Sequence, residues 1–173
     1  MPTYVWPCPT TASVSSYYGY RTPPTGGASS FHAAIDIPTP SGSPVVSIAD
    51  GTVYQIGYSD VRGHYVRILH GNGMVSHYQH LQGAVSGLAV GHKVVQSEQI
   101  AISGSSGIGT GPHTDVRLYK SVSTVGNEST TTDNGATYNP LDYLTPAAGG
   151  VVYPPGTGES SSQGVSFVRW IPG

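Results

Sequence analysis

The chain has 173 residues, the length of one domain with a short extension, and is long enough to bury a hydrophobic core without disulfide bonds. Charged residues make up only 9% of it, and the formal net charge is -2. A basic stripe that could bind phosphates is lacking, which argues against nucleic acid as a partner. The 24 Gly and 12 Tyr residues, with many Ser, Thr and Val, favour strands and turns, so the composition predicts an all-β protein.

Cys8 is the only cysteine, which excludes an intrachain disulfide bond and a thiolate metal cluster. It lies between two prolines, with no sign of a helix start that would lower its pKa, so we expect an inert thiol. No apolar run is long enough to cross a bilayer, and residues 1–7 have neither the charge nor the apolar core of a secretory signal. We expect either a signal removed beforehand, an unusual export route, or release by lysis, as for a phage protein.

Residues 1 to about 30 are rich in Pro, Ser, Thr and Gly and predict an irregular start of the chain. Asp50-Gly51 is a turn signal, and Gly71-Asn72-Gly73 predicts a hairpin turn. Short runs between such signals predict strands at residues 44–49, 51–56, 64–70, 74–80, 93–102 and 114–119. Short strands this close together predict antiparallel sheets, and no convincing helical period is present.

Composition also divides the chain along its length. Residues 139–144 resemble the end of a compact domain, and a Pro/Gly/Ser-rich linker follows up to residue 164. The chain then closes on an apolar, aromatic patch at 165–171, which predicts docking on its own domain or on a protein assembly such as a virion. The predicted organisation is an irregular segment at 1–16, a domain at 17–145 and an extension at 146–173.

Two pairs of residues have the chemistry of a metal site. His32 and Asp36 form a His-x-x-x-Asp motif, and imidazole nitrogen and carboxylate oxygen both bind zinc. Alone, this motif is weak and favours a surface histidine near a turn aspartate. His113 and Asp115 follow the Gly/Ser-rich loop at 103–112, and in a strand their side chains point to the same side. Both could therefore face one metal-binding cleft.

A third motif, His77-Tyr78-Gln79-His80, lies on a predicted strand. Alternation along a strand places His77 and His80 on opposite faces. We therefore expect one of them to face the cleft and the other to face solvent, and we do not expect them to share one metal ion.

In order and spacing, these motifs resemble the lysostaphin/LytM family of zinc endopeptidases over about residues 17–145. The family is expected to form antiparallel sheets with Gly-rich loops around a cleft. Besides His32-x-x-x-Asp36, the resemblance is carried by Tyr18-Gly19-Tyr20-Arg21, residues 42–53, His70-Gly71-Asn72-Gly73, Tyr78-x-His80-Leu81, residues 91–94 and Thr110-Gly111-Pro112-His113.

The resemblance implies one zinc ion held by His32, Asp36 and the residue at position 115. It also implies that His80 and His113 act on the metal-bound water and on the oxyanion. The family has a second histidine of His-x-His where this chain has Asp115. Carboxylate oxygen binds zinc at about 2.0–2.2 Å, so Asp115 is an acceptable ligand, but a His/Asp/Asp set neutralises the dication and should acidify its water less. Ala34, where the family prefers Gly, is a further departure.

The function implied by the resemblance is hydrolysis of a cross-bridge or stem peptide of bacterial peptidoglycan, outside the cytoplasm, in the cell wall or from a phage tail. Asp115 favours an alternative, in which a catalytically weakened domain of this fold binds peptidoglycan or serves a structural role in a phage tail. A biotinyl- or lipoyl-type carrier is a third possibility. It needs a lysine displayed in a hairpin, and neither Lys93 nor Lys120 is placed there.

Overall fold

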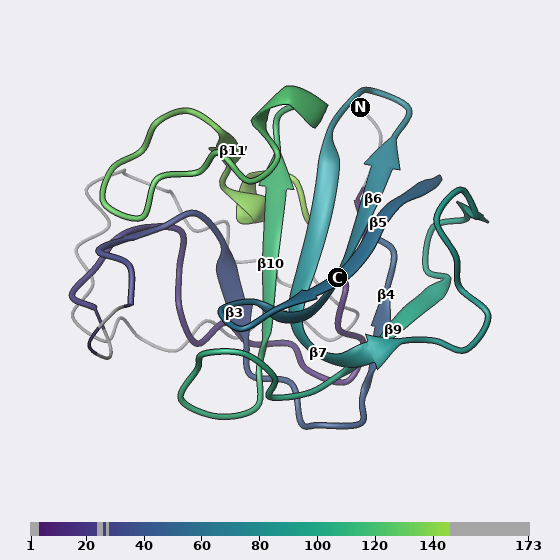
Figure 1. The fold of residues 1–173 in the computed structure, drawn as a ribbon, viewed down its shortest axis with the longest axis horizontal. Coiled ribbons are helices and arrows are strands. Elements are labelled where there is room, and N and C mark those ends of the chain that lie inside the picture. The colour runs from purple at the N-terminus through teal and green to yellow at the C-terminus, as the bar shows by residue number, and fades with distance from the viewer. Residues whose placement is uncertain (1–3, 24–25, 27, 146–173) are drawn as a thin grey trace, which may run out of the picture.

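A computed structural model describes residues 4–23, 26 and 28–145 (Figure 1). In this part of the chain the regular structure is β-strand apart from two 3-10 turns, η1 (Val122–Thr124) and η2 (Pro140–Asp142). The all-β prediction is confirmed. The strands are β1 (Gly19–Tyr20), β2 (Phe31–His32), β3 (Ile35–Ile37), β4 (Pro44–Val46), β5 (Gly51–Ser59), β6 (Gly63–His70), β7 (Val75–Ala84), β8 (Lys93–Val94), β9 (Gln99–Ser103), β10 (Thr114–Tyr119) and β11 (Thr137–Tyr138).

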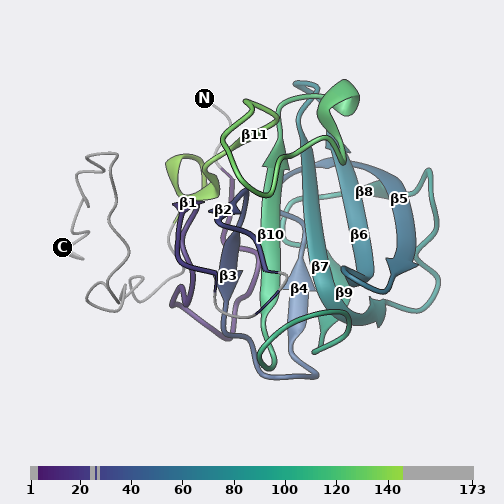
Figure 2. The same ribbon diagram turned by 60° about the vertical axis from the view of Figure 1, so that its left-hand side comes forward.

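The strands form one large sheet and a small β1–β2 pair, and all of these pairings are antiparallel, as predicted. Strands β10, β7, β6 and β5 follow one another across the large sheet (Figure 2). Strand β3 also pairs with β10, and β9 joins β4 to β7. The β3–β10 pairing matters most for function because it joins two distant predicted motifs.

One predicted strand is wrong in its extent. Residues 93–102 are divided into β8 and β9 by a turn in which the amide of Glu98 bonds to the carbonyl of Val95 and Ser97 has a φ of 69°. The carboxylate of Glu98 closes this turn by accepting a hydrogen bond from the amide of Val95. The two halves then pair with different partners, β8 with β5 and β9 with β4 and β7.

The N-terminal segment lies in the hydrophobic core although it forms few regular strands. Tyr4, Trp6, Cys8 and Val14 are buried among side chains of the sheet. The amide of Val5 bonds to the carbonyl of Ile48, and the amide of Val46 bonds to the carbonyl of Pro7, so the segment runs alongside residues 46–48. Burial raises the pKa of Cys8 to about 11, against smaller effects of hydrogen bonds, which supports the expected inert thiol.

We expect Trp6→Ala to lower the free energy of unfolding by about 3–5 kcal/mol, because it leaves a cavity in the core. It also removes the hydrogen bond from the indole to the carbonyl of Thr11, which measures 2.6 Å. Urea unfolding of the variant measures this loss, with Val90→Ala at an exposed position as the control. A loss as small as that of Val90→Ala would show that residues 4–16 are not part of the cooperative unit.

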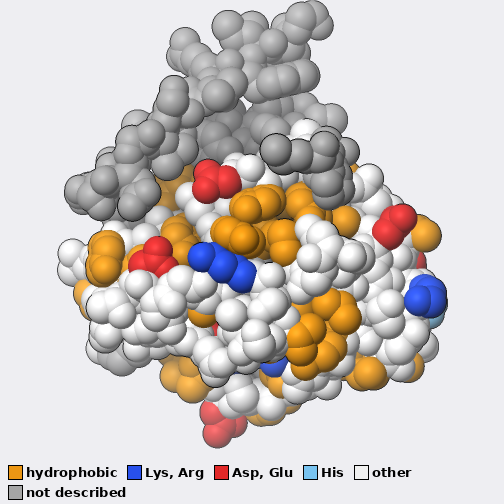
Figure 3. All heavy atoms as spheres, turned by 90° about the horizontal axis from the view of Figure 1, so that it is seen from above, with side chains coloured by type: hydrophobic (Ala, Val, Ile, Leu, Met, Phe, Trp, Pro, Cys, Tyr) orange, Lys and Arg blue, Asp and Glu red, His pale blue; other side chains and the backbone are white. Residues whose placement is uncertain are grey.

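Neutral residues dominate the outside of the domain as well. On the face shown in Figure 3, a few charged side chains are scattered among uncharged and hydrophobic ones, in keeping with the 9% of charged residues in the chain. Within the described residues, no helix has the length and apolar character needed to span a membrane. The C-terminal patch predicted at 165–171 lies outside the described residues.

Candidate metal centre

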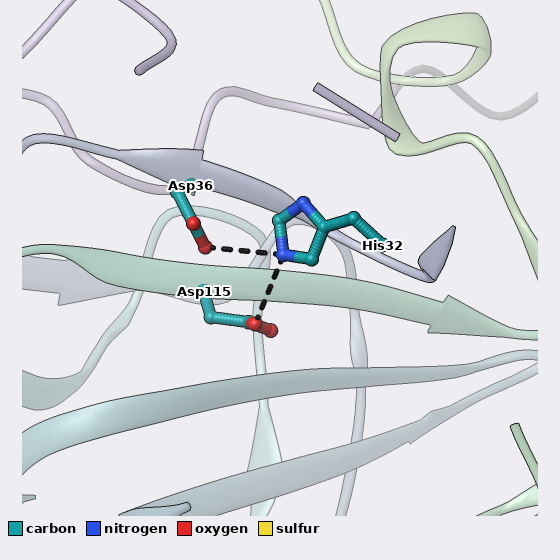
Figure 4. A group of neighbouring side chains, drawn as sticks. All are labelled: His32, Asp36 and Asp115. Carbon is teal, nitrogen blue, oxygen red and sulfur yellow. Dashed lines mark ion pairs between the residues drawn. The ribbon is translucent and has the colours of Figure 1, made fainter. Parts of the chain in front are cut away.

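Three strands bring together the three residues expected to bind metal. Asp36 on β3 and Asp115 on β10 are directly opposite each other in the antiparallel register, so their carboxylates lie on the same face. His32, at the end of β2, is buried above them. Its Nε2 lies 3.4 Å from Oδ1 of Asp36 and 3.5 Å from Oδ2 of Asp115 (Figure 4). One ligand atom from each residue lies within 4.8 Å of the others, a spacing at which all three could bind a single ion.

The bonding of these residues fits a divalent cation. Oδ1 of Asp36 is buried and has no hydrogen-bond partner among the described residues, and such an atom is costly unless something binds it. Two neighbouring carboxylates also repel each other unless positive charge lies between them. Histidine nitrogen with carboxylate oxygens is a donor set suited to zinc. The structure therefore supports a metal site at the position expected from the sequence.

The two carboxylates also control the protonation of His32. Burial by itself lowers the pKa of His32, but the neighbouring carboxylates, the charge of Asp36 first and then Asp115, outweigh burial and raise it to about 9. In the metal-free protein at neutral pH, the imidazolium of His32 therefore supplies the positive charge between the carboxylates. A metal ion must displace this proton to bind.

We expect the metal-free protein to lose stability between about pH 6.5 and 9. The pKa of His32 is about 9 in the folded chain and 6.5 without its partners, so this ion pair stabilises fully below pH 6.5 and its contribution disappears as the pH rises through 9. Urea unfolding with a chelator across this range measures the effect. In His32→Gln the free energy of unfolding should change much less with pH over this range. An equally steep pH dependence in that variant would show that His32 is not its cause.

A residue that the sequence analysis missed holds Asp115 in place. Nε of Arg117 donates to Oδ1 of Asp115 at 2.9 Å, and Nη2 donates to Oδ2 at 3.0 Å. Burial alone raises the pKa of Asp115, but Arg117 and then His32 hold it well below its usual range. Asp115 is therefore a fixed anion whose charge is partly offset by Arg117. Strand alternation in the sequence could have pointed to Arg117, because it places residues 115 and 117 on one face of β10.

Behind this pair lies a small network of buried charges. Glu128 accepts hydrogen bonds from Arg117 and Arg62, each at 2.7 Å. Arg62 in turn donates to the side-chain oxygen of Gln79 at 3.0 Å. Through Arg117, Glu128 and Arg62, the network holds Asp115 in place and connects it to Gln79 on strand β7.

The two histidines expected to be catalytic lie beside the metal centre. The rings of His80 and His113 are 4.6 Å apart, and Nε2 of His113 lies 3.9 Å from Oδ1 of Asp36. Each ring makes a contact through Nδ1 with a backbone carbonyl, His80 with that of Ser106 at 2.8 Å and His113 with that of Gly111 at 2.7 Å. A carbonyl can only accept, so both Nδ1 atoms carry a proton.

The expectation that His77 and His80 occupy opposite faces is wrong. His80 has a φ of 63°, in the left-handed region, and this turn breaks the alternation of β7. Both histidines consequently contact the same side-chain amide, that of Gln79. His77 is completely buried and does not face solvent. Burial is the main reason that the pKa of His80 is lowered, which keeps this ring neutral.

A hollow beside His80 is lined by Ser41, His64, Leu81, Gln82 and residues 104–106. The Gly/Ser-rich loop packs there against the β5–β6 turn, and the amide of Ile108 bonds to the carbonyl of Val61. Gly63 has a φ of 63°, and a Cβ at this position would collide with Ser106. The close approach of the two loops therefore requires glycine at position 63. This approach places the carbonyl of Ser106, which contacts Nδ1 of His80.

The chain matches the model of Peptidase family M23 over residues 30–138. Among curated relatives, the Peptidoglycan DD-endopeptidase ShyC of Vibrio cholerae is 33% identical over 99 residues, which cover 57% of this chain and 22% of the relative. The chain spans about a quarter of the length of the first curated relatives it matches.

Solved structures show the same architecture. A zinc-containing peptidase from Vibrio cholerae superposes with a TM-score of 0.61 and 28% identity, over 68% of this chain and 36% of that chain. The catalytic domain of lysostaphin from Staphylococcus simulans gives a TM-score of 0.58 at 23% identity, over 74% of this chain and 87% of that domain, and this likeness shows the fold. With the family model covering more than half of its length, the chain belongs to peptidase family M23.

Proposed function

We propose that this chain is a zinc-dependent endopeptidase that hydrolyses peptide bonds of bacterial peptidoglycan, and that it acts outside the cytoplasm at the cell wall. The observation that carries the proposal is the cluster of His32, Asp36 and Asp115, in which a buried carboxylate oxygen has no hydrogen-bond partner. Family membership and the name of the ShyC relative support the substrate class.

In this proposal His32, Asp36 and Asp115 hold one zinc ion, which when bound supplies a Lewis acid for a carbonyl oxygen and a water molecule. Because both Nδ1 atoms bind backbone carbonyls, proton transfer would involve the Nε2 atoms of His80 and His113, and that of His80 would first give up its contact with the amide of Gln79. Once protonated, such an Nε2 could stabilise negative charge on the substrate oxygen. Glu128 is excluded as a base because it is already paired with Arg62 and Arg117. The histidines therefore provide the acid-base chemistry.

The proposal is tested by incubating zinc-loaded protein with purified peptidoglycan sacculi and identifying the released fragments by mass spectrometry. We expect new peptide termini that identify the bond cleaved, and we expect a chelator to prevent their release. His32→Ala, which removes the metal ligand that both carboxylates contact, should be inactive. Intact sacculi after incubation with zinc-loaded wild-type protein would contradict the proposal.

A second candidate is a member of the family that binds peptidoglycan without cleaving it. One observation favours it, namely that both oxygens of Asp115 are engaged by Arg117. Sedimentation of the protein with sacculi, without release of fragments, is the result expected for this alternative. A place in a phage tail, for either candidate, stays a prediction that proteomic analysis of purified virions tests.

A further inference from the structure

A continuous line of buried hydrogen bonds approaches His80 from the interior of the sheet. Nε of Arg67 donates to Nδ1 of His77 at 2.8 Å, and Nε2 of His77 contacts Oε1 of Gln79 at 2.8 Å. An arginine can only donate, so Nδ1 of His77 is an acceptor. The proton of this neutral ring is therefore on Nε2 and is donated to Gln79. All three side chains are buried.

The direction of the bonds continues through Gln79 because Arg62 fixes its amide. Nη1 of Arg62 donates to Oε1 of Gln79 at 3.0 Å, so two donors meet at this atom and it must be the carbonyl oxygen. The opposite end of the amide is then the NH₂ group, and it lies 3.1 Å from Nε2 of His80. An NH₂ group donates, so Nε2 of His80 accepts.

The contact made by Nδ1, the other ring nitrogen of His80, also requires that Nε2 is the acceptor. Nδ1 of His80 lies 2.8 Å from the carbonyl of Ser106, which can only accept a proton. The backbone amide of His80 also bonds to the carbonyl of Arg62, at 2.9 Å, so one loop holds both the strand and the side chain of Gln79. Turning the ring over, or moving its proton to Nε2, would set two donors against each other at Gln79.

We propose that Gln79 is a positioning residue that fixes His80 in one tautomer, with the proton on Nδ1 and the lone pair on Nε2. Gln79 is opposite Asp115 in the β7–β10 register, and Nε2 is the ring nitrogen that faces Gln79, whereas Nδ1 faces the carbonyl of Ser106. In this tautomer the single lone pair of His80 is on Nε2, where it accepts the hydrogen bond of Gln79. Nε2 can take a proton from water only by giving up that hydrogen bond, and it has no proton to donate to an oxyanion. The role in the reaction rests on the proposed peptidase function, whereas the tautomer itself does not.

The tautomer is measured by NMR of zinc-loaded protein labelled with ¹⁵N-histidine, in which protonated and unprotonated ring nitrogens have well-separated shifts. The His80 signals are identified by their loss in His80→Gln. In the wild-type protein we expect the proton of His80 on Nδ1. In Gln79→Glu, the carboxylate cannot donate and should draw a proton onto Nε2. Gln99→Glu, at an exposed residue of β9, makes the same change of charge away from the site and should leave His80 unchanged.

A wild-type ring protonated on Nε2 would overturn the proposal even if Gln79→Glu does not fold. Unchanged His80 signals in a folded Gln79→Glu variant would overturn it as well. For the reaction, Gln79→Glu should lower kcat by roughly 100-fold with KM and zinc content unchanged. A protonated Nε2 in Gln79→Glu together with wild-type kcat would remove the role in catalysis. A confirmed tautomer in a protein that cleaves no peptidoglycan would instead refute the proposed function alone.

Discussion

Asp115→Ala should abolish stoichiometric zinc binding. The substitution removes one of three ligands, and it leaves the guanidinium of Arg117 beside the site without the carboxylate that it now contacts at 2.9 and 3.0 Å. That cation would repel a second positive charge, so we expect zinc affinity to fall by more than the roughly 10–100-fold typical of losing an outer-shell partner. Elemental analysis of the purified protein and a competitive chelator titration measure the change.

The same substitution should also destabilise the metal-free fold, by about 3–5 kcal/mol, because a buried ion pair loses one partner. Asp115→Asn separates the two effects, since it keeps the shape and a hydrogen-bond acceptor for Arg117 but lacks the charge. Asp133→Ala, at an exposed acidic residue away from the site, is the matched control and should retain zinc. Undiminished zinc in a folded Asp115→Ala variant would show that Asp115 is not a ligand.

His113→Ala should keep zinc and lose most of the peptidase activity. The Nε2 atom of His113 faces the metal centre, 3.9 Å from Oδ1 of Asp36, but the three-residue ligand cluster is complete without it. Removal of an acid-base group lowers kcat by about 100- to 10,000-fold, and we expect a loss in this range. The rate of fragment release from sacculi and the zinc content of the same preparation provide the two measurements.

The exposed His92, paired with Glu98 at 2.9 Å outside the site, supplies the control variant His92→Ala, which should have wild-type activity. Loss of zinc from His113→Ala would make this residue a ligand and would revise the site. Retained activity with retained zinc would leave His80 as the principal acid-base group and would exclude a catalytic role for His113.

The sequence alone determined the class of fold and the residue types available to the site. Turn signals such as Gly71-Asn72-Gly73 and the short runs between them were enough to predict antiparallel strands, because these patterns act over a few residues. The family resemblance of the motifs around His32, Asp36 and position 115 named the candidate ligands, and β2, β3 and β10 bring these residues together.

The tertiary structure decided everything that depends on contacts between distant segments. The burial of Trp6 and the division of residues 93–102 into two strands follow from packing and from the choice of pairing partners, which a local pattern does not contain. Likewise, alternation could place Arg117 on the same face as Asp115, but only the surrounding sheet turns the guanidinium onto that carboxylate.

The orientation of His80 shows the physical reason most directly. Alternation assumes extended backbone at every residue, and a single φ of 63° at His80 reverses the side to which its ring points. Such a conformation persists only when tertiary contacts hold it, here the carbonyls of Arg62 and Ser106 on two other loops. Residue types and spacing therefore specify which groups are available to the site, whereas long-range hydrogen bonds specify how each group is presented.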